Sequence, residues 1–456
     1  MTTELWVKNG YVFTSEGFRF ASIKIKNGTI EAISDSDVEP QKDCGSLFID
    51  AAGCLVVPGF IDAHVHFNDP GRSDWEGIET GSRAAAIGGT TTIFDMPLNS
   101  FPSVTSVIHL HNKREHLTHK SYVDFALWGG MTGESVTNKA ELDEMCEGII
   151  GWKAFMADSG IDDFPYTAPK QLELAMKMAA EQNKILGLHA EWQEEIHTLT
   201  TFYKHRKGVN ERKAFLLSRP ISAEEQAVST ALEIAAKYGT AIHFVHISSP
   251  KVIELIQQGK KSGIDVTVET CPHYLIFDEE DFLKKGSILK CAPPLRPRKE
   301  VEGLWECISN GWIDTIGSDH SPCLYSMKNT DSIWEAWGGI QGVQFTWLAL
   351  LDEALKRNIP LKNILPLGTE NVADRFRLTE KGRIQPGLDG DIVLISLDET
   401  TFVDQHSIAF RNQYSPYENK TFLLKIKKTI LRGKVIYDAQ TGVDHKKYGQ
   451  YIQPRK

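Results

Sequence analysis

Two histidines one residue apart are the first residues whose types and spacing could support chemistry. His64 and His66 lie at the end of the apolar run Leu55–Phe67. Alternate side chains of a strand point to the same face, so a strand here would present both imidazoles together. Such a pair can chelate Zn²⁺ or a similar cation, although a histidine packed in a core explains the motif alone equally well.

Four further residues capable of metal binding or proton transfer end other apolar runs. They are Lys153, His189, His246 and Asp319. Each has an ordinary structural explanation when it is considered alone. Their shared position at the ends of strand-like segments favours one common site, provided that the fold brings those ends together.

The pattern between residues 57 and 384 predicts a fold that does so. Strand-like runs alternate with amphipathic segments of helical length, such as 170–181 and 223–237, which is typical of parallel α/β proteins. Eight such units predict a (β/α)8 TIM barrel, whose catalytic side chains project from the carboxyl ends of the strands. A doubly wound sheet is the alternative, but no G-x-G-x-x-G follows the first run. The predicted strands are 57–66, 90–96, 122–128, 149–155, 185–189, 241–247, 264–270 and 312–318.

Both ends of the chain have a different character, with short strand runs between turn residues. In the N-terminal part, Asn9-Gly10 and Asn27-Gly28 are favoured hairpin-turn pairs. Strand runs also occur at 391–395 and 429–437. We predict that residues 1–56 and 385–456 pair into one small β-sandwich beside a barrel domain of residues 57–384.

Lys153 needs a chemical explanation, because an ammonium group cannot ligate a cation. A lysine that is desolvated on a barrel strand has a lowered pKa and can add CO₂ as the free amine. The resulting carbamate is an anion with two oxygens that could bridge two metal ions. A salt bridge between Lys153 and a nearby carboxylate is the alternative interpretation.

Composition excludes several classes of function. The chain has 456 residues, with 50 Lys and Arg against 60 Asp and Glu, so its formal net charge is −10. An acidic chain without a basic block is a poor nucleic-acid binder. No run is long and apolar enough to span a membrane, and the start of the chain lacks a signal-peptide pattern, so we expect a cytoplasmic protein. Its 7 cysteines are scattered and are expected to be reduced thiols.

Other histidines are not expected to bind metal. His109 and His111 are also one residue apart, but they fall in the polar segment 104–120, which predicts a helix. Residues two apart on a helix point in different directions, so we assign both to the surface, with His116 and His119. His243 is three residues before His246 and is expected to face away from it, beneath a helix.

Taken together, these residues resemble a known family. The run Pro58–His66, the isolated Lys153, His189, His246 and the run Ser318–His320 are similar to those of the cyclic amidohydrolases of the amidohydrolase superfamily, and within them to the allantoinases. The resemblance covers nearly the whole chain. It is most specific in residues 68–77, 95–99, 319–323 and 337–342.

The resemblance implies a binuclear metal-dependent hydrolase that opens the ring amide of allantoin to give allantoate in purine breakdown. Two divalent ions are implied, with Zn²⁺ favoured and Co²⁺ or Mn²⁺ as alternatives, and a homotetramer is also implied. Asp319 would in addition be the catalytic base and acid. The implied metal ligands are His64, His66, Lys153 as a carbamate, His189, His246 and Asp319.

Two related groups are distinguished by single positions. Dihydroorotases carry an arginine that holds the substrate carboxylate where this chain has Asn68, and hydantoinases and dihydropyrimidinases carry a tyrosine where it has Asp158. Both departures favour neutral allantoin over the related rings. A non-enzymatic scaffold is a further alternative, which the six filled ligand positions disfavour.

Three residues are candidates for substrate contacts. Asn99 could donate its side-chain amide, although an Asx-turn residue is an equal alternative. Cys291, in a proline-rich loop, could offer backbone groups. Gly338, with Gly339 beside it, could let the backbone approach the substrate closely.

Overall fold

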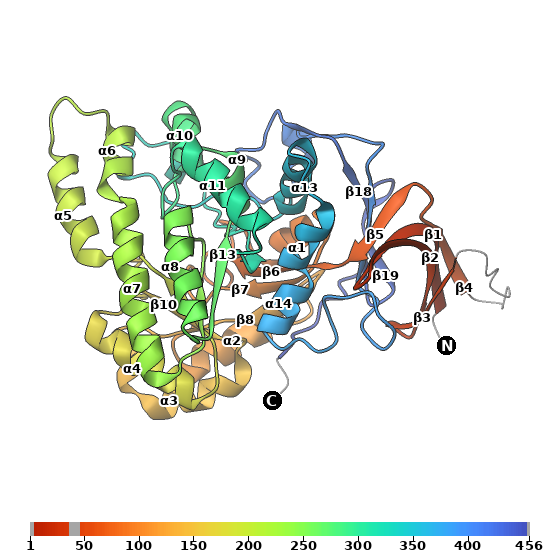
Figure 1. Cartoon of the computed structure of the whole chain (residues 1–456), viewed down its shortest axis with the longest axis horizontal. Helices are drawn as coiled ribbons and strands as arrows, with labels where there is room; N and C mark the ends of the chain where they lie inside the picture. The colour runs from red at the N-terminus through yellow and green to blue at the C-terminus, as the bar shows by residue number, and fades with distance from the viewer. Residues whose placement is uncertain (1–3, 36–45, 454–456) are drawn as a thin grey trace.

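The computed structural model describes residues 4–35 and 46–453. Figure 1 shows two parts, a helix-covered barrel and a twisted sheet that contains the N-terminal strands. Within the described residues, strands from both ends of the chain form one nine-stranded sheet. Its members are β1 (Glu4–Thr14), β2 (Gly17–Lys26), β3 (Thr29–Asp35), β4 (Ser46–Asp50), β5 (Cys54–Pro58), β15 (Ile392–Ser396), β18 (Lys425–Leu431), β19 (Lys434–Asp438) and β20 (Gly442–Val443).

The two chain ends meet where β5 pairs with β15 in antiparallel orientation. The spatial order is β20-β19-β18-β15-β5-β1-β2-β3, with β4 paired to β1. One predicted hairpin is confirmed, because Asn27-Gly28 links β2 to β3. Asn9-Gly10 was wrongly predicted as a turn: it lies within β1 at a register shift. A Cβ on Gly10 would come within 2.3 Å of Val56 Cγ2, so close packing against β5 explains this glycine.

All eight predicted barrel strands are present, and each pairs in parallel with its neighbours. The third is interrupted at Trp128 and is described as β8 and β9. The ring closes because the His66 amide donates to the His320 carbonyl at 2.8 Å, beside a parallel bridge between Val65 and His320. The strands are β6 (Phe60–Val65), β7 (Thr90–Asp95), β8 (Asp124–Leu127), β9 (Gly129–Gly130), β10 (Trp152–Phe155), β11 (Leu186–His189), β12 (Ile242–Phe244), β13 (Val266–Thr270) and β14 (Thr315–Ile316).

The start of the first barrel strand differs from the prediction. Val57 and Pro58 pair with β15 and therefore belong to the nine-stranded sheet. The chain passes from this sheet to the barrel at Gly59, whose amide donates to the Asp391 carbonyl at 2.8 Å. A Cβ on Gly59 would lie 2.3 Å from Thr91 Oγ1, so the crossing point has no room for a side chain.

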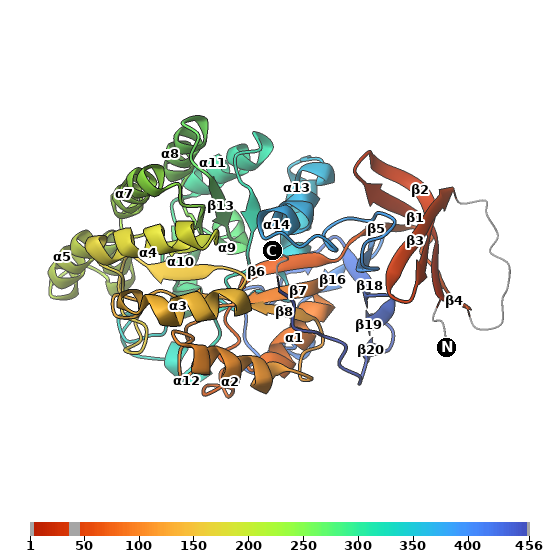
Figure 2. The ribbon, with the colours of Figure 1, turned by 90° about the horizontal axis from the view of Figure 1, so that it is seen from below.

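Helices surround the barrel strands (Figure 2). The two predicted amphipathic segments form α4 (Pro169–Glu181) and α7 (Ile221–Tyr238). On α7 the buried residues include Ala223, Ala227, Ala231 and Ala235, a spacing of four that places small side chains on one face. The α-helices are α1 (Ile78–Ile87), α2 (Val107–Leu117), α3 (Lys139–Met145), α4 (Pro169–Glu181), α5 (Gln193–Lys204), α6 (Glu211–Ser218), α7 (Ile221–Tyr238), α8 (Pro250–Lys261), α9 (Pro272–Ile276), α10 (Glu279–Lys285), α11 (Arg298–Ser309), α12 (Tyr325–Lys328), α13 (Thr346–Lys356) and α14 (Glu370–Arg375).

Shorter elements complete the described chain, and none of the helices found there has the length and apolar character needed to cross a membrane. Two small strands, β16 (Thr401–Phe402) and β17 (Thr421–Phe422), pair with each other. The 3-10 helices are η1 (Ser135–Thr137), η2 (Cys146–Gly148), η3 (Gly286–Leu289), η4 (Leu361–Asn363), η5 (Leu365–Gly368) and η6 (Gln405–Ser407).

Candidate active site

The six predicted metal ligands lie at the carboxyl end of the barrel. They come from β6, β10 and β11 and from the residues that follow β6, β12 and β14. All are buried, with exposed fractions between 0% for Lys153 and 9% for Asp319. A cavity of about 460 Å³ opens above them and is lined by every member of the set except Lys153.

His64, His66 and Asp319 form the tightest group. The Nε2 atoms of His64 and His66 lie 3.2 Å and 3.4 Å from the same atom, Asp319 Oδ1. The predicted common face of the histidine pair is therefore confirmed. Burial alone would raise the pKa of Asp319, but the neighbouring histidines, above all His64, hold it well below its usual value. The candidate ligand atoms of these three residues all lie within 4.8 Å of one another.

The hydrogen bond on the other side of His64 shows why a cation fits here. His64 Nδ1 lies 2.8 Å from Glu269 Oε1. Although burial opposes ionisation, the neighbouring His64 and His243 lower the pKa of Glu269 to about 2, so its carboxylate accepts and His64 Nδ1 carries the proton. Burial also lowers the pKa of His64, which favours neutral imidazole. Its Nε2 lone pair then faces an Asp319 oxygen, and a cation between two such acceptors removes their repulsion.

His189 and His246 are arranged in a similar way. His189 Nε2 lies 2.8 Å from Glu191 Oε2, and its Nδ1 lies 3.0 Å from His246 Nε2. Burial opposes ionisation of Glu191, but Arg219 and His189 lower its pKa to about 2. Burial is also the main reason that the pKa of His246 is well below its usual value. Two largely neutral imidazoles therefore meet on the cavity side, which suits metal ligands.

Lys153 has the environment that the carbamate hypothesis requires. Its Nζ is buried and makes no hydrogen bond to any of the described residues. Burial lowers the pKa of Lys153 to about 8, so the free amine is far more accessible than for an ordinary lysine. The ammonium forms no ion pair within the described chain, which disfavours the salt-bridge alternative. Its Nζ lies 5.1 Å from the centroid of the Phe155 ring.

Three functional residues were missed by the sequence analysis. Glu269 on β13 contacts His64, Glu191 contacts His189, and Arg219 is paired with Glu191. Glu269 and Arg219 are distant in sequence from the residues that they contact, so local sequence patterns do not connect them. A signal was present at Glu269, because a carboxylate within the strand Val266–Thr270, which lies inside the barrel, needs a buried partner.

All three predicted substrate contacts line the cavity. Asn99 Nδ2 lies 3.3 Å from His66 Nδ1, so this side chain also contacts a candidate ligand. Burial raises the pKa of the Cys291 thiol to about 12, which leaves its backbone as the useful group. Gly338 has no atom within 4 Å of an added Cβ, whereas one on Gly339 would meet the Ser321 carbonyl at 2.4 Å. Gly339, and not Gly338, is therefore the glycine that packs closely against another backbone segment.

One wall of the cavity is held by buried lysines. All six residues of the loop 334–339 line the cavity. Lys328 Nζ donates to the carbonyls of Ser287, Trp337 and Gly339 at 3.0, 2.8 and 2.6 Å. Lys290 Nζ donates to the carbonyls of Ala336 and Trp334. The side chains of Lys328 and Lys290 therefore hold the backbone of this loop through hydrogen bonds to its carbonyls.

The two positions used to choose among rings differ in their exposure to the cavity. Asp158 lines it and accepts from the Gly160 amide at 3.0 Å. Asn68 is 1% exposed, does not line the cavity, and donates to the Pro322 carbonyl at 3.1 Å. Position 68 therefore bears on the choice of ring substrate only because it lacks an arginine. The asparagine itself does not face the cavity.

The histidines not expected to bind metal lie away from the candidate metal centre. His109 and His111 are on α2, as predicted, with His111 exposed and His109 Nδ1 2.9 Å from the Ser103 carbonyl. His116 contacts the buried Asp69 at 2.8 Å. His243 packs on Phe376 beside α14, but its Nε2 also lies 3.5 Å from Glu269 Oε2.

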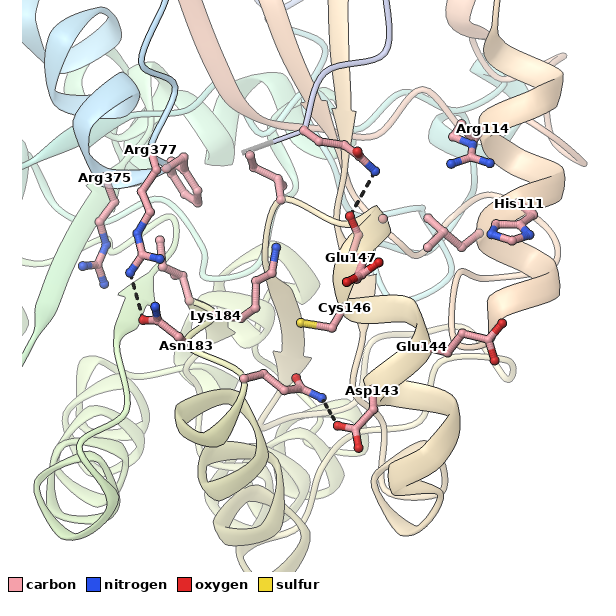
Figure 3. Close-up of a pocket in the computed structure, with 17 residues that line it drawn as sticks. His111, Arg114, Asp143, Glu144, Cys146, Glu147, Asn183, Lys184, Arg375 and Arg377 are labelled. Carbon is pink, nitrogen blue, oxygen red and sulfur yellow. Dashed lines mark hydrogen bonds between the residues drawn. The ribbon is translucent and has the colours of Figure 1, made fainter. Parts of the chain in front are cut away.

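A larger cavity of about 770 Å³ lies elsewhere, among α2, α3 and the end of α14 (Figure 3). Figure 3 shows charged side chains around it, including Arg114, Glu147 and Arg377. Its lining residues Ile150 and Ile185 precede β10 and β11, so it is at the amino end of these strands. None of the predicted site residues lines it.

Comparison with known proteins shows the family to which this chain belongs. Residues 55–436 match the amidohydrolase family. An allantoinase of Bacillus velezensis is 40% identical over 454 residues, covering 100% of this chain and 98% of that protein, and one of Deinococcus radiodurans is 40% identical with 100% of both covered. The solved structure of an L-hydantoinase (dihydropyrimidinase) from Arthrobacter aurescens matches with a TM-score of 0.94 and 30% identity, covering 99% of this chain and 100% of that one. This chain therefore belongs to the amidohydrolase family, and is a cyclic amide hydrolase of it.

Proposed function

We propose that this protein hydrolyses the ring amide of allantoin to give allantoate, using two divalent metal ions. The reaction class rests on one observation, that the Nε2 atoms of His64 and His66 both face Asp319 Oδ1 at the floor of the cavity. The choice of allantoin is supported by the allantoinases that are 38–40% identical over essentially the whole chain.

The candidate ligands fit a binuclear centre. The donor set is larger than one tetrahedral zinc needs. It consists of two histidine pairs, one carboxylate and one buried lysine without a hydrogen-bond partner among the described residues. When bound, the ions would supply an activated water and polarise the ring carbonyl. Zn²⁺ is the expected metal and Co²⁺ or Mn²⁺ are alternatives. The residues that would hold the ions are His64, His66, carbamylated Lys153, His189, His246 and Asp319.

The protein's own groups would then carry the proton and hold the ring. Asp319 has a carboxylate at the cavity floor, where it can take the proton of the attacking water and return it to the leaving ring nitrogen. A cavity of about 460 Å³ suits a small heterocycle. Asn99, Cys291 and Gly338 line this cavity. In this proposal the Asn99 side chain and the backbone of Cys291 and Gly338 would bind the polar edges of the ring and its ureido arm.

The test is a comparison of kcat/KM on allantoin, hydantoin, dihydrouracil and dihydroorotate, together with elemental analysis. We expect about two metal ions per chain and the highest kcat/KM on allantoin. Asp319→Asn serves as the inactive control. A higher kcat/KM on any other ring, or metal-free active protein, would contradict the proposal.

Hydantoin hydrolysis is the second candidate activity. It is favoured by the 30% identity and TM-score of 0.94 to the L-hydantoinase structure. The same substrate comparison separates the two activities. An assembly of four subunits remains a proposal based on family resemblance, which light scattering of the purified protein would test.

A further inference from the structure

Glu269 is a buried carboxylate that contacts three histidines beneath the candidate metal centre. It lies on β13, the one barrel strand between β10 and β14 that supplies no predicted ligand, and is fully buried. Oε1 accepts from His64 Nδ1 at 2.8 Å and from the backbone amide of His246 at 3.3 Å. Oε2 lies 3.5 Å from His243 Nε2. One carboxylate therefore connects β6, β12 and β13 directly below the cavity.

The neighbouring strand leaves space for this carboxylate. A Cβ on Gly317 would lie 2.5 Å from Glu269 Oε2 and 2.8 Å from the Cβ of His64. Any larger residue would push the carboxylate and the imidazole out of their present positions. The glycine at position 317, directly after β14, is therefore required by the contact between Glu269 and His64 and not only by the local backbone.

His246 also depends on this contact. Its backbone has a φ of +43°, a left-handed conformation that is unfavourable for a residue with a Cβ. The bond from its amide to Glu269 Oε1 is one of the interactions that hold this conformation. The same oxygen thus fixes a side chain at one candidate ligand and the backbone at another.

We propose that Glu269 is a positioning residue that sets the affinity of the site for metal. By accepting from His64 Nδ1, it holds the tautomer in which Nε2 faces Asp319, and by accepting from the His246 amide it keeps that second histidine on the cavity rim. An ionised acceptor also makes the imidazole a stronger donor to a cation. This inference rests on the proposed metal-dependent function and concerns a residue that would not touch either metal or substrate.

The experiment measures Zn²⁺ affinity by competition with a chromogenic chelator, using wild type, Glu269→Gln and Glu269→Leu. Glutamine keeps a neutral acceptor of the same shape, so we expect about tenfold weaker binding, whereas leucine removes the acceptor and should weaken binding about 100-fold. Gly317→Ala displaces the same carboxylate from the other side. We expect Gly317→Ala to weaken Zn²⁺ binding as well. It therefore tests the same inference if the leucine variant does not fold.

Asp352→Asn is the matched control, because Asp352 is also a buried carboxylate, 3% exposed, that accepts a backbone amide, that of Leu423 at 2.8 Å. It lies on α13 and does not line the cavity. We expect a lower Tm of the metal-free protein with unchanged Zn²⁺ affinity. Wild-type affinity in both Glu269 variants would overturn the inference, whereas a wild type that binds no metal would overturn the proposed function itself.

Discussion

Replacing Lys328 with methionine should loosen the loop 334–339 that forms one wall of the cavity. Methionine has a similar length and volume but no donor, so the carbonyls of Ser287, Trp337 and Gly339 lose their shared partner. Lys328 is 2% exposed, so water does not readily replace it. Each unsatisfied buried acceptor costs about 1–3 kcal/mol.

The lower end of that range is appropriate, because burial disfavours the ammonium and lowers the pKa of Lys328 to about 8. Three carbonyls at about 1 kcal/mol each give about 3 kcal/mol. A change of that size raises the local opening equilibrium by roughly 100-fold. Lys290 still holds the carbonyls of Ala336 and Trp334, so we expect local opening and not loss of the loop structure.

Hydrogen exchange measured by mass spectrometry on peptides that cover residues 334–340 tests this expectation. Protection should fall by roughly 100-fold in Lys328→Met, while peptides from β6 to β8 keep the protection of wild type. Lys139→Met is the control, since Lys139 is a 55% exposed side chain whose partners are Asp143 and Glu181. Protection within about threefold of wild type would refute the reasoning, because the carbonyls would then have found other partners.

Three further predictions concern single residues. The Lys153→Ala variant should lose its metal, and its kcat/KM should fall by more than about 100-fold. Added short carboxylates should restore part of the activity. An unmodified Lys153 amine in the crystal structure of metal-loaded, active enzyme would exclude the carbamate. His111→Ala, on the exposed face of α2, should keep metal content and kcat/KM within about twofold of wild type, and loss of metal would contradict its assignment to the surface. Burial raises the pKa of Cys291 from 9.0 to about 12. Alkylation of the Cys291 thiol in folded protein at pH 8 should therefore be about 1,000-fold slower than alkylation of an ordinary thiol, and its rate should rise with pH. Rapid modification of Cys291 at pH 8, measured by mass spectrometry, would contradict the burial argument.

The barrel and its rim could be predicted because both depend on local patterns. Apolar runs between amphipathic segments locate the strands, and parallel strands place their carboxyl ends together. The change from sheet to barrel at Gly59 was missed, since the chain is apolar on both sides of Pro58-Gly59 and only pairing with β15 assigns Val57 and Pro58 to the sheet. The role of Glu269 was not predicted for a related reason. Its role depends on contacts with His64 and His246, which are distant in sequence and are brought close only by the folded barrel.

The closure between the first and last barrel strands has a consequence for folding and kinetic stability. Besides the His66 to His320 bond, the Ser318 hydroxyl donates to the His64 carbonyl across a separation of 254 residues. Contacts of such long range form against a large loss of chain entropy, so we expect the closure to form late in folding and to separate early in unfolding. His64 and His66 lie on one side of it and Asp319 on the other. A cation that they share would act as a cross-link between the two ends of the barrel, and chelation would then lower the barrier to unfolding as well as stop turnover.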